Sequence, residues 1–174
     1  PYSRTFYYID KGHEQGLAAG LIRDFELYLN TKHKKQLKRR PITVYAVPVT
    51  RDKMLDALSS GKVDIAVGNL TITEKRLEQV DFVPLTVSDI NEIVVSHEDV
   101  AMPATTDGLA GQTIHVRPSS SYYESLLALN ERLVQQGKQP IELELLPDAL
   151  EDEDLLEMVN VGIIPMVIMD NWKA

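Results

Sequence analysis

The sequence predicts an α/β protein made of two units with largely parallel sheets. Strand-like and helix-like hydrophobic periods alternate along the chain, as they do where helices connect parallel strands. Charge also divides the chain, because residues 1–95 hold 14 basic and 12 acidic residues whereas residues 96–174 hold 4 and 14. Net charges of +2 and −10 indicate two units. A length of 174 residues suits two small lobes.

The first elements are expected in the order strand, turn and helix. Aromatic and β-branched residues at 5–9 predict a strand, and a turn follows at 12–16. Apolar residues at helical spacing then predict an amphipathic helix over 17–30. The side chains expected to face the core are Leu17, Leu21, Ile22, Phe25 and Leu29.

Two more strands are expected in the first half, at 42–47 and 63–67, with a helix between them. Thr50 is suited to cap that helix and Gly61 to end it. Its apolar face consists of Met54, Leu55 and Leu58.

A continuous apolar run at 90–95 predicts a strand that passes between the units, after which the alternation restarts. Strands are expected at 113–116, 141–146 and 163–169, with a helix over 151–159. Ser121 and Glu124 have the spacing of a capping box. The helix behind that box carries an apolar face of Leu126, Leu127, Leu129, Leu133 and Val134.

Composition argues against several classes of function. The formal net charge of −8 disfavours nucleic acid, which needs clustered positive charge. Cysteine is absent, so disulfides and thiolate metal sites are excluded. No stretch approaches the roughly 20 apolar residues that cross a bilayer. The four histidines lack metal-ligand spacing, so we expect no metal, no cofactor and no catalysis; they are His13, His33, His97 and His115.

The segment with the most specific chemistry is GKVDIAVGNLTITEKR at 61–76. A buried strand is expected to lead into a polar turn and then a short helix. Backbone N–H groups, the Thr71 hydroxyl and the Arg76 guanidinium would then converge on one anion. The alternative is that Thr73 caps a short helix while Arg76 makes a surface ion pair. Residues 111–124 again bring a strand and a polar turn to a helix N-terminus, which favours a negative or acceptor-rich group.

Residues 61–76, with the following Val-Asp-Phe at 80–82, closely resemble the signature of family 3 extracellular solute-binding proteins, and the resemblance covers nearly the whole chain. It implies a periplasmic-binding-protein-like α/β fold of type II, with two lobes joined by a hinge. It also implies that Arg76 grips the carboxylate of a ligand. Thr71 and the backbone at Asn69 would assist from the first lobe, and Ser120 and Ser121 from the second.

Two further site residues are implied by the resemblance. Asp170 lies where amino-acid receptors of the family commonly place an acidic residue against the ligand's ammonium, although it is also a natural turn residue. Phe6, Tyr7 and Tyr8 lie where family members supply a ring over the ligand. Strand alternation puts Tyr7 on the opposite face from the other two rings, so not all three line a cleft. Tyr7 is the ring assigned to the site, and which ring lines the cleft stays open.

The resemblance implies a first lobe over 1–92, a second lobe over 93–170 and the start of a return crossover at 171–174. Family members usually have a strand before the stretch near Pro1 and return to the first lobe after Asp170, so we expect a fragment truncated at both ends. In place of the family's Phe-Ser-x-Pro-Tyr, the chain has Phe-Val-Pro-Leu at 82–85. This difference removes a polar side chain and a ring near the cleft.

Within the family, segments such as 108–111 and 119–124 look most like the sensor domains of membrane-bound lytic murein transglycosylases of the F type. The sequence therefore predicts a periplasmic or extracellular module that captures a small carboxylate-bearing solute in an interlobe cleft. That solute is an amino acid, a short peptide or a muropeptide. The module would serve as a transporter receptor or a regulatory sensor domain, so its expected partner is an inner-membrane transporter or a fused catalytic domain. We expect no direct insertion of the module into the membrane.

Two alternatives stay open. An enzyme of the same fold could use cleft carboxylates, for which Asp64, Asp81 and Asp170 are the candidates. The basic run at 32–40 could contact nucleic acid or an anionic membrane, and the competing interpretation is a solvated helix end whose cations complement the dipole.

Overall fold

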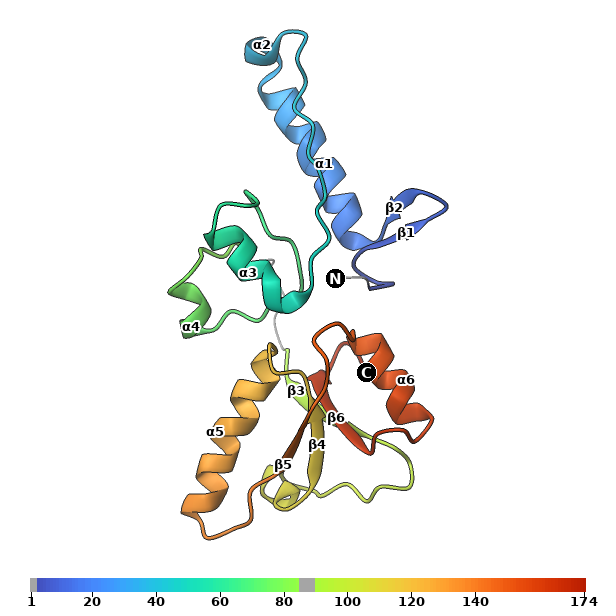
Figure 1. The fold of residues 1–174 in the computed structure, drawn as a ribbon, viewed down its shortest axis with the longest axis vertical. Coiled ribbons are helices and arrows are strands. Elements are labelled where there is room, and N and C mark those ends of the chain that lie inside the picture. The colour runs from blue at the N-terminus through green and yellow to red at the C-terminus, as the bar shows by residue number, and fades with distance from the viewer. Residues whose placement is uncertain (1–2, 85–89) are drawn as a thin grey trace. The chain divides into compact units, whose positions relative to one another are not determined.

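The computed structural model describes residues 3–84 and 90–174, which form two compact units, Pro1–Leu70 and Thr71–Ala174 (Figure 1). The predicted lobe boundary after residue 92 stays a prediction. Leu85, from the pattern that departs from the family's, lies outside the described residues.

The second unit contains a four-stranded sheet in the order β3-β6-β4-β5. Its strands are β3 (Glu92–Ser96), β4 (Thr113–Val116), β5 (Glu142–Leu145) and β6 (Met166–Asp170). β4 is parallel to β5 and β6, and β3 is antiparallel to β6. The predicted α/β class with a largely parallel sheet is therefore confirmed.

The helices of the second unit are α4 (Glu74–Leu77), the 3₁₀ helix η1 (Thr106–Leu109), α5 (Ser121–Gln135) and α6 (Asp152–Asn160). α5 and α6 cover its sheet. α5 joins β4 to β5 and α6 joins β5 to β6, and the two lie on opposite sides of the sheet (Figure 1). All five residues of β6 are buried, as expected for a continuous apolar strand between two neighbours.

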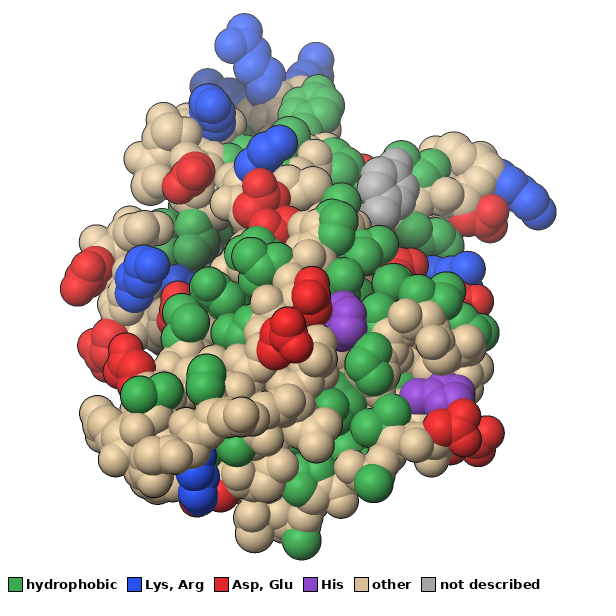
Figure 2. Space-filling model, turned by 60° about the horizontal axis from the view of Figure 1, so that its bottom comes forward, with side chains coloured by type: hydrophobic (Ala, Val, Ile, Leu, Met, Phe, Trp, Pro, Cys, Tyr) green, Lys and Arg blue, Asp and Glu red, His purple; other side chains and the backbone are tan. Residues whose placement is uncertain are grey.

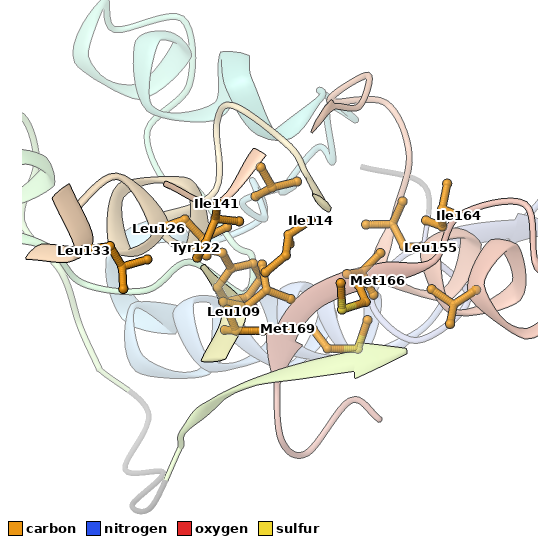
Figure 3. Close-up of a cluster of buried hydrophobic side chains, with 14 residues drawn as sticks. Leu109, Ile114, Tyr122, Leu126, Leu133, Ile141, Leu155, Ile164, Met166 and Met169 are labelled. Carbon is orange, nitrogen blue, oxygen red and sulfur yellow. The ribbon is translucent and has the colours of Figure 1, made fainter. Parts of the chain in front are cut away.

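Figure 3 shows the hydrophobic core of the second unit, to which α5, α6 and the central strands β4 and β6 contribute. Ile114, Leu133 and Met169 have no exposed surface. The predicted apolar face of α5 is correct for Leu126 and Leu133, which are buried. It is wrong for Leu127 and Val134, which are 42% and 58% exposed, because the buried stripe follows the spacing 122, 126, 129 and 133.

The first unit begins with a hairpin of β1 (Tyr8–Asp10) and β2 (His13–Gln15). The predicted strand at 5–9 is therefore short, and the predicted turn at 12–16 is largely a second strand. Lys11 and Gly12 form the two-residue loop with φ values of 49° and 82°, the geometry that suits the right-handed twist of a hairpin. Gly16 follows at φ 98°, where a Cβ would lie 2.5 Å from the Phe6 carbonyl oxygen.

Helix α1 (Leu17–Lys32) confirms the predicted helix, but its buried face differs from the prediction. Ala18 and Ala19 are buried, and they pack with Tyr7. Leu17 and Leu21 are 66% and 45% exposed, because the small residues between them make the close contact. The remaining helices of this unit are α2 (Lys34–Leu37) and α3 (Arg51–Ser59). Met54 is buried as expected, and Thr50 lies at the N-cap position of α3, but its side chain makes no capping hydrogen bond.

The predictions of strands at 42–47 and 63–67 are wrong, since neither segment forms a strand in the described part of the chain. Side chains of α1 take the place of a neighbouring strand for the first segment. Asn30 bonds both backbone groups of Ile42, at 2.8 Å each, and Glu26 accepts from the Val44 N–H at 2.6 Å. In the second unit Asn130 holds both backbone groups of Ile141 in the same way, at 2.9 and 2.6 Å, but there β5 follows.

Candidate functional site

The Arg76 guanidinium lies at the centre of the candidate site in the second unit. Thr73 caps the short helix α4 and its hydroxyl accepts from the Arg76 N–H at 3.4 Å. The alternative is therefore correct in its Thr73 cap, but it is wrong in placing Arg76 at the surface, because Arg76 is only 8% exposed. Its Nη1 donates to the Thr71 carbonyl at 2.7 Å and its Nη2 to the Ser119 carbonyl at 3.0 Å. Both acceptors are uncharged, and they fix the guanidinium between two chain segments.

The N-terminus of α5 forms the other side of this site. Ser120 is the N-cap, with its hydroxyl accepting from the Tyr123 N–H at 3.3 Å, so the predicted cap at Ser121 is wrong by one position. The Ser121 hydroxyl instead donates to Thr71 Oγ1 at 2.9 Å. Ser120 and Ser121 are both buried. The structure thus brings Thr71, Arg76 and the first turn of α5 together.

The turn before α5 is itself anchored. The backbone N–H and the hydroxyl of Ser119 both donate to Asp148 Oδ1, at 3.1 and 2.5 Å. Asp148 lies just beyond β5. The carbonyl that accepts from Arg76 therefore belongs to a turn that two hydrogen bonds anchor to the neighbouring loop.

A buried group of charged side chains, the ion network, lies in the same unit. Its members are Arg117, Glu151, Asp152, Asp170 and Lys173. Arg117 pairs with Asp152 and lies 3.9 Å from Glu151. Lys173 Nζ lies 2.5 Å from Asp152 Oδ2 and 3.2 Å from Asp170 Oδ2. Of these residues the sequence predicts only Asp170 as functional, because a pair such as 117 and 152 gives no local signal.

Tyr122 connects the ion network to α5. Its hydroxyl accepts from the Asp170 backbone N–H at 3.2 Å and from Lys173 Nζ at 2.9 Å. Burial raises the pKa of Tyr122 well above its usual range, and the charges of Asp152 and Asp170 raise it further. The phenol therefore stays protonated at any physiological pH.

Two predicted site residues belong to the first unit. Tyr7 is buried against Ala18 and Ala19, and its hydroxyl donates to Glu14 at 3.0 Å. The Asn69 carbonyl accepts from Arg51 Nη1 at 2.7 Å. Their assignment to the ligand stays a prediction.

The basic run at 32–40 contains six Lys and Arg residues, and every one of them is exposed. Figure 2 shows Lys and Arg side chains gathered at the top of the view. Within residues 3–84 and 90–174, no group of three His, Asp or Glu side chains could hold a metal ion. Over the same residues, no helix has the length and apolar character needed to span a membrane.

The chain belongs to the bacterial extracellular solute-binding proteins of family 3, whose family model matches residues 2–168. It is 27% identical over 128 residues to the L-cystine-binding protein TcyJ of Escherichia coli K12, covering 73% of this chain and 44% of that protein. It is 29% identical over 124 residues to the membrane-bound lytic murein transglycosylase F of Desulfosudis oleivorans, covering 71% of this chain and 26% of that protein. The chain thus spans less than half of either relative.

Solved structures agree on the fold. The Gly52Ala mutant of the arginine-bound ArgBP from T. maritima matches with a TM-score of 0.68 and 19% identity, over 98% of this chain and 70% of that one. This likeness confirms the α/β fold of periplasmic-binding-protein type II.

We expect Glu92 to give the second unit a pH-dependent stability. Glu92 opposes Asp170 across the β3-β6 pair, and partial burial of its carboxyl raises its pKa above 4.5. The Ser125 hydroxyl, 3.1 Å away, lowers this pKa, and the Asp170 charge raises it. The folded pKa exceeds the unfolded one, so the contribution to stability is complete below the unfolded pKa and is lost as pH rises through the folded pKa.

Glu92→Gln is therefore expected to gain thermal stability relative to the wild type as pH rises from 4 to 8. Melting temperatures measured across this range by circular dichroism test the expectation, with the exposed Glu98→Gln as the control. A difference between Glu92→Gln and wild type that is the same at every pH would contradict it.

Proposed function

We propose that this domain captures a small carboxylate-bearing solute, such as an amino acid, a short peptide or a muropeptide, without transforming it. Its membership of a solute-binding family supports this function. The observation that carries the proposal is the buried Arg76 guanidinium, held by the carbonyls of Thr71 and Ser119 at the N-terminus of α5. The domain would act in the periplasm or outside the cell.

The chemistry of these groups suits a carboxylate. A guanidinium presents a planar fork of N–H donors that matches two carboxylate oxygens. The hydroxyls of Thr71 and Ser121 lie beside it, and the positive end of the α5 dipole favours negative charge. Because internal hydrogen bonds already fix the guanidinium, binding costs little side-chain ordering. Ser120, Asp170, Tyr7 and the backbone at Asn69 remain the further contacts that we assign to the ligand.

Two biological contexts fit the relatives. One similar protein is named for binding L-cystine and another is a membrane-bound murein transglycosylase, so this domain would be a transporter receptor or a regulatory sensor of a catalytic domain. A thermal-shift screen of amino acids, short peptides and muropeptides identifies the class of ligand. A ligand at a hundred times its dissociation constant adds about 2.7 kcal/mol of stability.

Arg76→Ala is expected to weaken binding of the screened ligand by roughly 10- to 150-fold, which is about 1.5–3 kcal/mol for a charge-assisted hydrogen bond. Arg76→Lys should recover only part of this loss, because an ammonium lacks the fork. Isothermal titration calorimetry measures both variants, with the exposed Arg39→Ala as the control. Unchanged affinity in Arg76→Ala would disprove the site, and a chemically altered ligand after incubation would disprove binding without catalysis.

A further inference from the structure

The Lys173 ammonium forms an ion pair with Asp170, the residue that ends β6. Asp170 is 4% exposed, and the Lys173 ammonium lies 3.2 Å from its Oδ2. The same ammonium lies 2.5 Å from Asp152 Oδ2 and 2.9 Å from the Tyr122 hydroxyl. It also sits 5.4 Å from the centroids of the Tyr122 and Trp172 rings. Five groups therefore hold this one cation in place.

This cation lies next to the candidate site. The first turn of α5 contributes to both, because Ser121 bonds Thr71 beside Arg76 and the adjacent Tyr122 bonds Lys173. The first turn of α5 therefore contacts the Lys173 ammonium and also forms the helix end that favours an anion beside Arg76.

An incoming ammonium would have to compete with Lys173 for Asp170. Displacing Lys173 would break its contacts with Asp152 and Tyr122, and the buried carboxylate of Asp152 would lose one of its two cations and keep only Arg117. The network formally keeps one surplus negative charge, from three carboxylates against Arg117 and Lys173. Glu151 sits at the N-cap of α6, where the helix dipole stabilises that charge.

We infer that Lys173 is the built-in counter-ion of Asp170, so that Asp170 acts on the ligand through Lys173 and not by direct contact, and that the site around Arg76 selects carboxylates whose neighbouring nitrogen is absent or uncharged. Such ligands are 2-hydroxy acids, N-acylated amino acids and peptides with an acylated amino end. The α-ammonium of a free amino acid would bring a second positive charge to Asp170, which already has the Lys173 ammonium beside it. This inference rests on the proposed function, since it names the class of carboxylate that Arg76 binds.

The test uses the whole chain and matched sets of probes. L-Glutamine is compared by calorimetry with its 2-hydroxy analogue and with N-acetyl-L-glutamine, and L-alanine with L-lactate and N-acetyl-L-alanine. The 2-hydroxy acids have nearly the size of the amino acids, so they separate charge from bulk. In the wild type we expect the uncharged member of at least one set to bind about tenfold or more tightly than the free amino acid.

Lys173→Met removes the internal cation and is expected to shift this ratio at least tenfold toward the free amino acid. The exposed Lys138→Met is the matched control and should leave the ratio within twofold. If Lys173→Met does not fold, the wild-type ratio alone decides. Tighter binding of the free amino acids by the wild type, or a ratio that Lys173→Met does not shift, overturns the inference and leaves the Arg76 proposal standing. Failure of every probe to bind overturns both.

Discussion

Arg117→Ala is expected to lower the free energy of unfolding by about 3–5 kcal/mol, because it removes a cation from beside buried carboxylates. Arg117 is 2% exposed and pairs with Asp152. Its Nη1 also donates to the Leu150 carbonyl at 2.6 Å. Truncation removes the cation and this donor together, and it leaves Lys173 as the counter-ion of both Asp152 and Asp170.

The matched control is Arg132→Ala in the same unit. Arg132 pairs with Asp107 at 3.2 Å, but its side chain is 52% exposed, so its loss should cost only about 0.2–1 kcal/mol. Urea unfolding followed by tryptophan fluorescence and circular dichroism measures both variants. Equal losses from the two arginines would mean that the pair at Arg117 is solvated, and the buried ion network would have to be abandoned.

The second unit was largely predictable from local patterns. Apolar periodicity locates its strands and helices, and the capping-box spacing of Ser121 and Glu124 predicts the start of α5 to within one residue. Local spacing chose the wrong serine. Ser120 reaches the Tyr123 N–H, while the Ser121 hydroxyl is drawn to Thr71, fifty positions away. Such a choice depends on tertiary contacts that sequence spacing does not encode.

The ion network was unpredictable for a related reason. The acidic run at 151–154 has the pattern of a helix N-terminus, and it is one, since the Glu151 N–H donates to Asp154 at 2.8 Å. The same run also buries Asp152 against Arg117, and neither residue has a local feature that distinguishes it from a surface charge. The cap is local, whereas the ion pair exists only once β4 and α6 are assembled.

In the first unit, local patterns predicted strands that do not form. The periodicity at 42–47 and 63–67 is that of strands, and Ala46 and Val67 do pack against Tyr7 and its neighbours. A strand also needs a hydrogen-bonded neighbour, however, and side chains of α1 bond the backbone at Ile42 and Val44 instead. In these two segments the hydrophobic pattern predicts the packing of Ala46 and Val67, but not the partner of each backbone group.

Leu126→Ala and Leu127→Ala are expected to differ sharply although they are adjacent in α5. Leu126 is 2% exposed within the core of the second unit, so its truncation should cost about 2–5 kcal/mol of unfolding free energy. Leu127 is 42% exposed, and its loss should cost no more than about 1 kcal/mol. The same substitution in one helix changes helix propensity equally, so the difference isolates burial.

Urea denaturation of the two variants tests the rotation of α5 about its axis. That rotation also aims the Ser121 hydroxyl at Thr71 and the Tyr122 phenol at Lys173. Each residue turns an α-helix by about 100°, so a larger loss at Leu127 than at Leu126 would place the helix a full position out of register. The contacts of Ser121 with Thr71 and of Tyr122 with Lys173 would then be lost together, and with them the geometry on which the ligand site and its internal counter-ion depend.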